Sequence, residues 1–181
     1  MSGDVRRSYV VGLGANLGDR AAALKSAVLA LQAHGDVQAV SDLYEAAAVG
    51  PLQPDYLNAA VRLESSLPPQ QLLCELLSIE RAHGRERRQR WGPRTLDLDL
   101  LYSPALLLNE PDLTLPHPEL ARRAFALTPL LDVAPGALEP RSGERYTDLL
   151  ASLGPQGLRR VEPALSWDPR PNRSRAPGRV E

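Results

Sequence analysis

The stretch RWGPRTLDLDLLY, residues 90–102, joins a turn to a strand and decides how the rest of the chain must pack. Gly-Pro favours the turn, and the alternation of leucine with aspartate that follows predicts a strand with one buried face. The leucines expected in the core are Leu96, Leu98 and Leu100. Asp97 and Asp99 then share the opposite face, with Cα atoms ~6.5–7 Å apart on strand geometry.

Two carboxylates on one face of a strand repel each other unless a cation or arginines neutralise them. Magnesium is a suitable cation, because it usually takes one or two carboxylates together with waters and substrate phosphates. Two such ions about 3.5–4 Å apart can share one carboxylate pair. A solvent-facing strand that carries aspartate by chance is the alternative, although aspartate is disfavoured in strands.

An arginine-rich loop lies immediately upstream of the two aspartates. Its arginines are Arg85, Arg87, Arg88, Arg90 and Arg94. Arginine binds phosphate oxygens through two parallel hydrogen bonds, so the loop predicts a phosphate site. A solvated loop and an RNA-binding patch remain open as alternatives, but carboxylates just downstream would repel a nucleic acid backbone.

The remaining hydrophobic pattern predicts the element order βαββαβ. Strands are expected at residues 8–14, 37–46, 56–65 and 96–102, and helices at 21–33 and from Pro68 to Gly84. This order is typical of a ferredoxin-like α+β sandwich, with an antiparallel sheet and both helices on one face. The other face stays uncovered unless later segments fold over it. A short strand at 106–109 and short C-terminal helices at 122–135 and 146–153 are also predicted.

Composition indicates one compact domain over residues 1–153, because the chain has 181 residues of which 43% are hydrophobic. The Pro- and Arg-rich tail, residues 154–181, is expected to be disordered. A net charge of -1 gives no global attraction to nucleic acid or membrane, so neither partner is expected. Cys74 is the one cysteine, which suits a reducing compartment. No signal peptide and no apolar run of roughly 20 residues is seen, so we expect a cytoplasmic protein.

Six stretches carry a resemblance to a known family. They are VGLGANLGDR (11–20), PDYLNAAVRLES (54–65), IERAHGRER (79–87), WGPRTLDLDLL (91–101), LPHPEL (115–120) and RRAFALTPLLDVAP (122–135). In this order they resemble the 6-hydroxymethyl-7,8-dihydropterin pyrophosphokinase family over about residues 8 to 150. The resemblance implies a ferredoxin-like fold and transfer of diphosphate from ATP to the pterin hydroxymethyl group in folate biosynthesis, releasing AMP. It also implies two Mg²⁺ ions, with ATP as co-substrate and the pterin as the other small-molecule partner.

The resemblance further assigns roles to individual residues. Catalytic positions are Arg85, Arg94, Asp97 and Asp99, of which the two aspartates also hold the metal. Pterin positions are Ala46, Ala47, Val49, Tyr56, Asn58, Trp91 and Phe125. ATP positions are Glu80, Arg87, Arg94, Leu100, Thr114, His117 and Arg123. Among these, Tyr56 and Phe125 are implied to stack on the pterin, the alanines to act through their backbone, and Trp91 to help close a lid.

Other functions stay open at the level of sequence. No G-x-x-x-x-G-K-[ST] phosphate loop is present, and GLGANLG, residues 12–18, has the wrong spacing for a dinucleotide fingerprint. We interpret that glycine-rich stretch as a tight structural turn. A nucleic-acid-binding module of ferredoxin-like fold would use the arginine loop and the basic tail. A non-catalytic pterin-binding homologue would bind pterin without releasing AMP.

Overall fold

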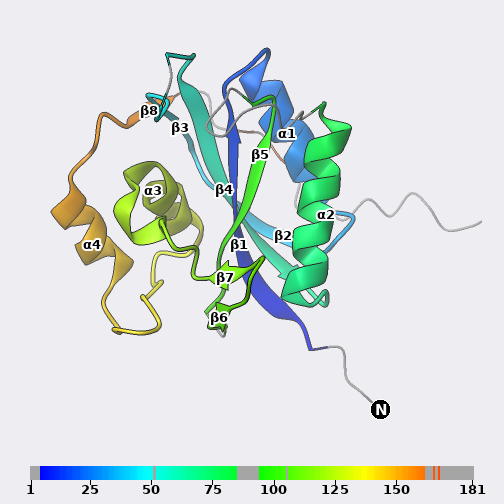
Figure 1. The fold of residues 1–181 in the computed structure, drawn as a ribbon, viewed down its shortest axis with the longest axis vertical. Coiled ribbons are helices and arrows are strands. Elements are labelled where there is room, and N and C mark those ends of the chain that lie inside the picture. The colour runs from blue at the N-terminus through cyan, green and yellow to red at the C-terminus, as the bar shows by residue number, and fades with distance from the viewer. Residues whose placement is uncertain are drawn as a thin grey trace, which may run out of the picture.

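The protein is described here by a computed structural model that covers residues 5–50, 52–84, 94–104, 106–161, 165 and 167. The strands are β1 (Arg7–Ala15), β2 (Asp36–Val40), β3 (Leu43–Ala46), β4 (Tyr56–Ser65), β5 (Asp97–Tyr102), β6 (Leu108–Asn109), β7 (Thr114–Leu115) and β8 (Arg159–Val161). The helices are α1 (Arg20–Leu31), α2 (Pro69–Ala82), α3 (Ala124–Val133) and α4 (Tyr146–Leu153). A 3-10 turn at Leu120–Arg122 precedes α3. Figure 1 shows the main sheet standing between α1 and α2 on one side and α3 and α4 on the other.

The main sheet runs in the order β5-β1-β4-β3-β8, with β2 also pairing with β4, and its pairs are antiparallel. The predicted strand at 56–65 is confirmed as β4. The single strand predicted at 37–46 is wrong, because β2 and β3 are separated at Ser41. The Ser41 hydroxyl accepts a hydrogen bond from the Ala60 N–H at 2.8 Å and donates to the Asp42 carbonyl at 2.7 Å. The Ser41 hydroxyl therefore takes the place of a backbone carbonyl in the ladder with β4, at the break between β2 and β3.

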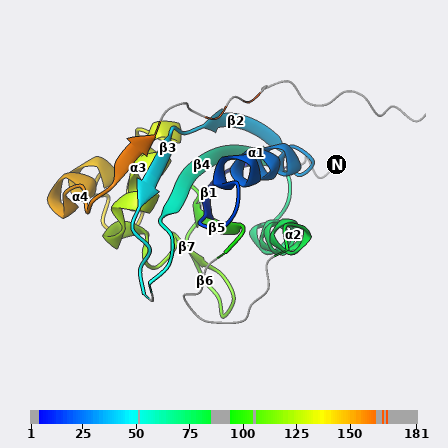
Figure 2. The ribbon, with the colours of Figure 1, turned by 90° about the horizontal axis from the view of Figure 1, so that it is seen from above.

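Helices α1 and α2 cover one face of the sheet, as Figure 2 shows from above. The Asp19 side chain caps α1 by accepting from the Ala22 N–H at 3.0 Å, and Pro69 starts α2. The core under these helices contains the three leucines predicted from the opening stretch, which are Leu96, Leu98 and Leu100, each at most 3% exposed. The βαββαβ order and the ferredoxin-like α+β fold with both helices on one face are thus confirmed.

Helices α3 and α4 cover part of the opposite face and form a second core with Val10, Ala60 and Leu101. The pairing of β1 with β5 shifts register between Val10 and Val11. A shift of this kind places an extra residue in one strand and changes which face its side chains take. Leu101 and Tyr102 accordingly both lie in the second core, whereas Leu100 lies in the first. The rest of this face, in front of Asp97 and Asp99, is left open for a pocket.

The expectation that the chain is disordered from residue 154 onward is wrong for residues 159–161, which form β8 against β3. The open edge of β3 offers backbone partners, and Arg159 and Arg160 pair with Glu45 and Asp42 respectively. Leu165 and Trp167 pack against the first core. Within the described part of the chain, no helix is long and apolar enough to cross a membrane.

Candidate active site

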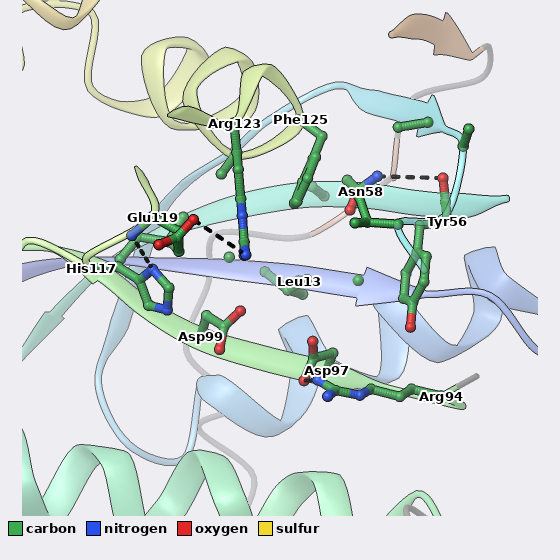
Figure 3. A pocket seen from close by; sticks show the side chains of 18 residues that line it. Leu13, Tyr56, Asn58, Arg94, Asp97, Asp99, His117, Glu119, Arg123 and Phe125 are labelled. Carbon is green, nitrogen blue, oxygen red and sulfur yellow. Dashed lines mark hydrogen bonds and ion pairs between the residues drawn. The ribbon is translucent and has the colours of Figure 1, made fainter. Parts of the chain in front are cut away.

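A pocket of about 410 Å³ lies on the open part of the sheet, between β1, β4 and β5 and the segment that leads into α3. Figure 3 shows polar side chains entering it from several directions. Eleven of the residues predicted for the site line it: Ala46, Ala47, Val49, Tyr56, Asn58, Arg94, Asp97, Asp99, His117, Arg123 and Phe125. Residues from five separate stretches of sequence therefore meet at one place.

Asp97 and Asp99 both project from β5 into this pocket, as the alternation predicted (Figure 3). Among the described residues no group of three or more His, Cys, Asp and Glu could hold a metal ion. The described residues therefore do not provide a metal site that is made only of protein ligands. Two carboxylates in an open pocket do fit Mg²⁺, because this ion usually keeps waters and completes its shell with substrate phosphates.

Arg94 lies at the edge of the same carboxylate pair. Its Nη1 is 2.6 Å from Oδ1 of Asp97. Burial lowers the pKa of Arg94, but the nearby carboxylates of Asp97 and Asp99 outweigh burial and raise it. The guanidinium therefore stays charged at any relevant pH and is a fixed positive group beside the two carboxylates.

Asn16 fixes the position of Arg94 and was missed by the sequence analysis. Its Oδ1 accepts from the Arg94 N–H at 2.7 Å, and its own N–H donates to the Arg94 carbonyl at 3.1 Å. Its Nδ2 donates to Gln53 Oε1 at 2.9 Å and to the Pro54 carbonyl at 3.0 Å. With 2% of its surface exposed, Asn16 joins three segments around the pocket. A polar residue in a turn gave no signal of burial, so only the fold reveals this role.

Tyr56 and Asn58 come from the same face of β4, two residues apart, and Phe125 comes from α3 on the other side of the pocket (Figure 3). The Asn58 amide donates to the carbonyls of Tyr44 and Tyr56, both at 3.3 Å. These bonds fix the side chain in one orientation. The Arg123 guanidinium carbon is 5.7 Å from the centre of the Phe125 ring, within the range of a cation–π contact.

His117 supplies a neutral hydrogen-bond donor at the side of the pocket that Arg123 lines. Burial first, and then the positive charge of Arg123, lower the pKa of His117, whereas Glu119 and Asp97 raise it less. Its Nδ1 lies 3.2 Å from the Glu119 N–H, which donates to it. A neutral imidazole that accepts at Nδ1 carries its proton at Nε2, so Nε2–H can donate. Glu119, a second residue that the sequence analysis missed, also pairs with Arg123 at 3.7 Å.

Three residues predicted to bind ATP do not line the pocket. Glu80 is 1% exposed and accepts from the Leu98 N–H at 2.7 Å, on the helix side of β5. Leu100 is 3% exposed in the first core, because its position in the alternation turns it away from the aspartates. Thr114 lies in β7. The Leu100 side chain therefore faces the first core and not this pocket. Arg85, Arg87 and Trp91 lie outside the described residues.

The floor of the pocket is formed by Gly12 and Gly14, which lie within β1 and line the pocket. The strand predicted at 8–14 included both glycines, whereas the interpretation of residues 12–18 as a tight turn is wrong for them. A Cβ on Gly14 would be 3.5 Å from both Asn58 Oδ1 and Tyr56 Cδ1. A Cβ on Gly12 would be 2.8 Å from Leu101 Cδ1. The sequence pattern that could have revealed this role is the alternation of glycine with apolar residues in a predicted strand. Such a pattern indicates a strand face on which space is left for a ligand.

The sequence of the chain is similar to a family of known enzymes along most of its length. The model of the 7,8-dihydro-6-hydroxymethylpterin-pyrophosphokinase family matches residues 10–135. A 2-amino-4-hydroxy-6-hydroxymethyldihydropteridine pyrophosphokinase of Synechocystis is 44% identical over 158 residues, covering 86% of this chain and 81% of the relative. An enzyme of the same name from Methylorubrum extorquens is 42% identical over 159 residues, covering 86% and 99% respectively.

Solved structures agree at the level of fold. A crystal structure of Plasmodium falciparum HPPK-DHPS superposes with a TM-score of 0.67 at 13% identity and covers 83% of this chain. The chain spans about half the length of that protein, since the match covers 46% of it. With a family model matching more than half of its residues and relatives above 40% identity, this chain belongs to the 7,8-dihydro-6-hydroxymethylpterin-pyrophosphokinase family.

Proposed function

We propose that the pocket is the active site in which this chain transfers a pyrophosphoryl group from ATP to the hydroxymethyl group of 6-hydroxymethyl-7,8-dihydropterin and releases AMP, a step of folate biosynthesis. The activity follows from the family to which the chain belongs. The assignment of residues rests mainly on one observation, which is that two carboxylates and two arginines face the same open pocket. This combination suits the binding and transfer of phosphate groups.

The pterin would occupy the end of the pocket lined by Tyr56, Asn58 and Phe125. Aromatic rings there can stack on a flat heterocycle, and Asn58, whose Nδ2 donates to two backbone carbonyls, offers its Oδ1 as an acceptor for the edge of the ring. The backbone of Ala46, Ala47 and Val49, which line the same pocket, adds further polar groups. The bare glycine floor leaves room for the ring.

The triphosphate would lie towards Arg94, Arg123 and the Nε2–H of His117. These groups hold the phosphates in place and neutralise charge while the substrate hydroxyl attacks the β-phosphorus. The bond from the β-phosphorus to the oxygen of AMP breaks, and the hydroxyl proton is lost. Asp97 and Asp99 would hold two Mg²⁺ ions, which when bound stabilise the negative charge of the transferring group.

The test is AMP formation from MgATP and hydroxymethyl-dihydropterin by the folded chain and by Asp97→Ala. We expect the substitution to lower the rate at least about 100-fold with little change in melting temperature, because Asp97 is on the open side of β5. Asp112→Ala is the matched control, since Asp112 is an exposed acid outside the pocket and should leave the rate unchanged. Full activity of Asp97→Ala, or no AMP from the folded unmodified chain, contradicts the proposal.

We also propose that small molecules are the partners of this site, that the chain does not bind nucleic acid, and that it acts in the cytoplasm. The near-zero net charge and single cysteine support these assignments. Salt-dependent binding of an RNA oligonucleotide at micromolar protein concentration would favour the nucleic-acid-binding alternative instead.

A further inference from the structure

Strand β5, which carries both aspartates, is an outer strand of the main sheet and pairs with β1 on one side only. In that pairing Asp97 stands opposite Gly14, Leu98 opposite Leu13, and Asp99 opposite Gly12. Backbone N–H groups of neighbouring residues in an antiparallel strand point to opposite edges. One edge of β5 therefore needs partners from outside the sheet.

Glu80 provides one of these partners at the residue between the two aspartates. Its Oε1 accepts the Leu98 N–H at 2.7 Å, and the Glu80 side chain is 1% exposed. A hydrogen bond to a carboxylate is shorter and stronger than one between neutral groups. Glu80 therefore fixes the outer edge of β5 at Leu98, while β1 fixes its inner edge.

The helix end that carries Glu80 is itself held in place. The Thr95 hydroxyl donates to the His83 carbonyl at 2.8 Å, which joins the end of α2 to the residues just before β5. The His83 ring contacts Ser26 Oγ of α1 at 2.9 Å and the Ile79 carbonyl at 2.8 Å. The C-terminal turn of α2 is thus connected to α1 on one side and to β5 on the other.

We propose that Glu80 is a positioning residue that sets the spacing of Asp97 and Asp99 for metal binding, acting through the backbone of Leu98. The inference deepens the proposed function and rests on it. Without the carboxylate acceptor, the outer edge of β5 loses its hydrogen bond at Leu98. The spacing between the side chains of Asp97 and Asp99 is then no longer fixed. Pterin binding is left intact, because Tyr56, Asn58 and Phe125 come from β4 and α3.

The experiment compares the full chain with Glu80→Leu, Glu80→Gln and Leu76→Ala. Leucine removes the acceptor at similar size, and glutamine keeps an acceptor oxygen. Leu76→Ala is a matched control for stability, because Leu76 is fully buried on the same helix. Mn²⁺ is titrated in the presence of an ATP analogue that cannot transfer its phosphates, and protein-bound Mn²⁺ is followed by electron paramagnetic resonance. KM values for pterin and ATP and exchange of the Leu98 amide proton are measured in parallel.

We expect Glu80→Leu to raise the Mn²⁺ concentration for half-saturation by about tenfold or more, as is typical when a group that orients a metal ligand is lost. Its Leu98 amide should exchange faster, and its KM for pterin should stay unchanged. Glu80→Gln should recover most of the metal affinity, and Leu76→Ala should bind Mn²⁺ normally despite a lower melting temperature.

Two outcomes overturn the inference about Glu80, and a third overturns the proposed metal site on which it rests. Normal Mn²⁺ binding by Glu80→Leu, or weakened binding of equal size in Leu76→Ala, shows that Glu80 has only a general structural role. If Asp97→Ala binds Mn²⁺ as well as the unmodified chain does, the proposed metal site itself has failed. The Asp97→Ala variant therefore distinguishes failure of the inference about Glu80 from failure of the proposed function.

Discussion

At the scale of single residues, the shape of the pocket depends on a glycine, which has no side chain, as well as on the residues whose side chains line it. Gly14 stands opposite Asp97 in the β1–β5 ladder and beside Asn58 and Tyr56 in space. Its backbone is an ordinary part of a strand, so the glycine is needed for space and not for an unusual backbone angle. We therefore expect the size of this one residue to control access to the end of the pocket where we propose that the pterin binds.

Replacing Gly14 tests this control of access. Alanine places a Cβ at ordinary contact distance, 3.5 Å from the nearest atoms, and should be tolerated. Gly14→Val extends further into the pocket and should raise the KM for pterin by about tenfold or more, because overpacking of about one or two methyl groups costs ~1–3 kcal/mol. Steady-state kinetics with circular dichroism as the folding control check this. An unchanged KM in the valine variant would show that the pterin does not rest on the glycine floor.

His117 gives the stability of the fold a dependence on pH. Burial and Arg123 lower the pKa of His117 from its ordinary value of 6.5. The unfolded chain therefore binds this proton more readily than the folded chain does. The stability contributed by keeping His117 neutral is present in full above about pH 6.5 and is lost as the pH falls through the folded pKa.

His117→Gln removes that titration and keeps a donor near the position of Nε2. We expect the free energy of unfolding to fall less between pH 7 and pH 5 in this variant than in the unmodified chain. Urea denaturation at both pH values measures the difference. His34→Gln is the control, because His34 lies outside the pocket. Equal losses in the unmodified chain and in His117→Gln would contradict the lowered pKa.

At the scale of elements, the strands that line the pocket are held together by a connecting residue outside them. Asn16 follows β1 and joins the segment before β5, at Arg94, to the segment before β4, at Gln53 and Pro54. Its amide uses both its oxygen and its nitrogen in these contacts. A buried amide with all partners satisfied fixes geometry, whereas its removal leaves buried backbone groups without partners.

Asn16→Ala should lower the free energy of unfolding by about 2–4 kcal/mol, since three side-chain hydrogen bonds of about 1 kcal/mol each are lost from a buried site. It should also lower the rate of AMP formation by releasing Arg94. Asn16→Asp keeps the acceptor for the Arg94 N–H and loses the two donated bonds, so it should retain more activity than alanine. Chemical denaturation and initial rates provide the measurements. If alanine and aspartate variants have equal activity, the bond to Arg94 does not matter.

At the scale of the whole molecule, residues near the end of the chain hold two walls of the pocket in place. Gln156 accepts from the Ala124 N–H at 3.0 Å and donates to the Arg122 carbonyl at 3.3 Å, which caps the start of α3. A few residues later, β8 pairs with β3. Helix α3 presents Phe125 and β3 presents Ala46, so one short segment supports two elements that line the pocket where we propose that the pterin binds.

A chain that ends at Gly154 should therefore bind pterin less well than a chain that ends at Asp168. We expect a KM for pterin several-fold higher and a free energy of unfolding lower by about 3 kcal/mol or more, because the cap on α3, the β8 ladder and the packing of Leu165 and Trp167 on the first core are lost. The KM for ATP should change little. Kinetics and thermal melting of both truncated chains measure these effects. Identical pterin KM values would show that α3 and β3 keep their places unaided.

The sequence by itself determined most of the elements and the half of the site that lies on one strand. Alternation placed Asp97 and Asp99 on one face of β5, because period two is a local property of an extended backbone. The helices under the sheet followed from apolar spacing, and in the structure Asp19 caps one of them and Pro69 begins the other. The family resemblance added the residues on β4 and α3 that the structure brings to the same pocket.

Tertiary structure alone decided which groups support these residues. Asn16, Glu80 and Gln156 act on partners that lie between 18 and 78 residues away in the sequence. Their roles depend on which backbone groups are left without partners when strands and helices meet, and no local pattern contains that information. The same reason explains β8, since an arginine-rich segment becomes a strand only because β3 presents an open edge beside acidic side chains.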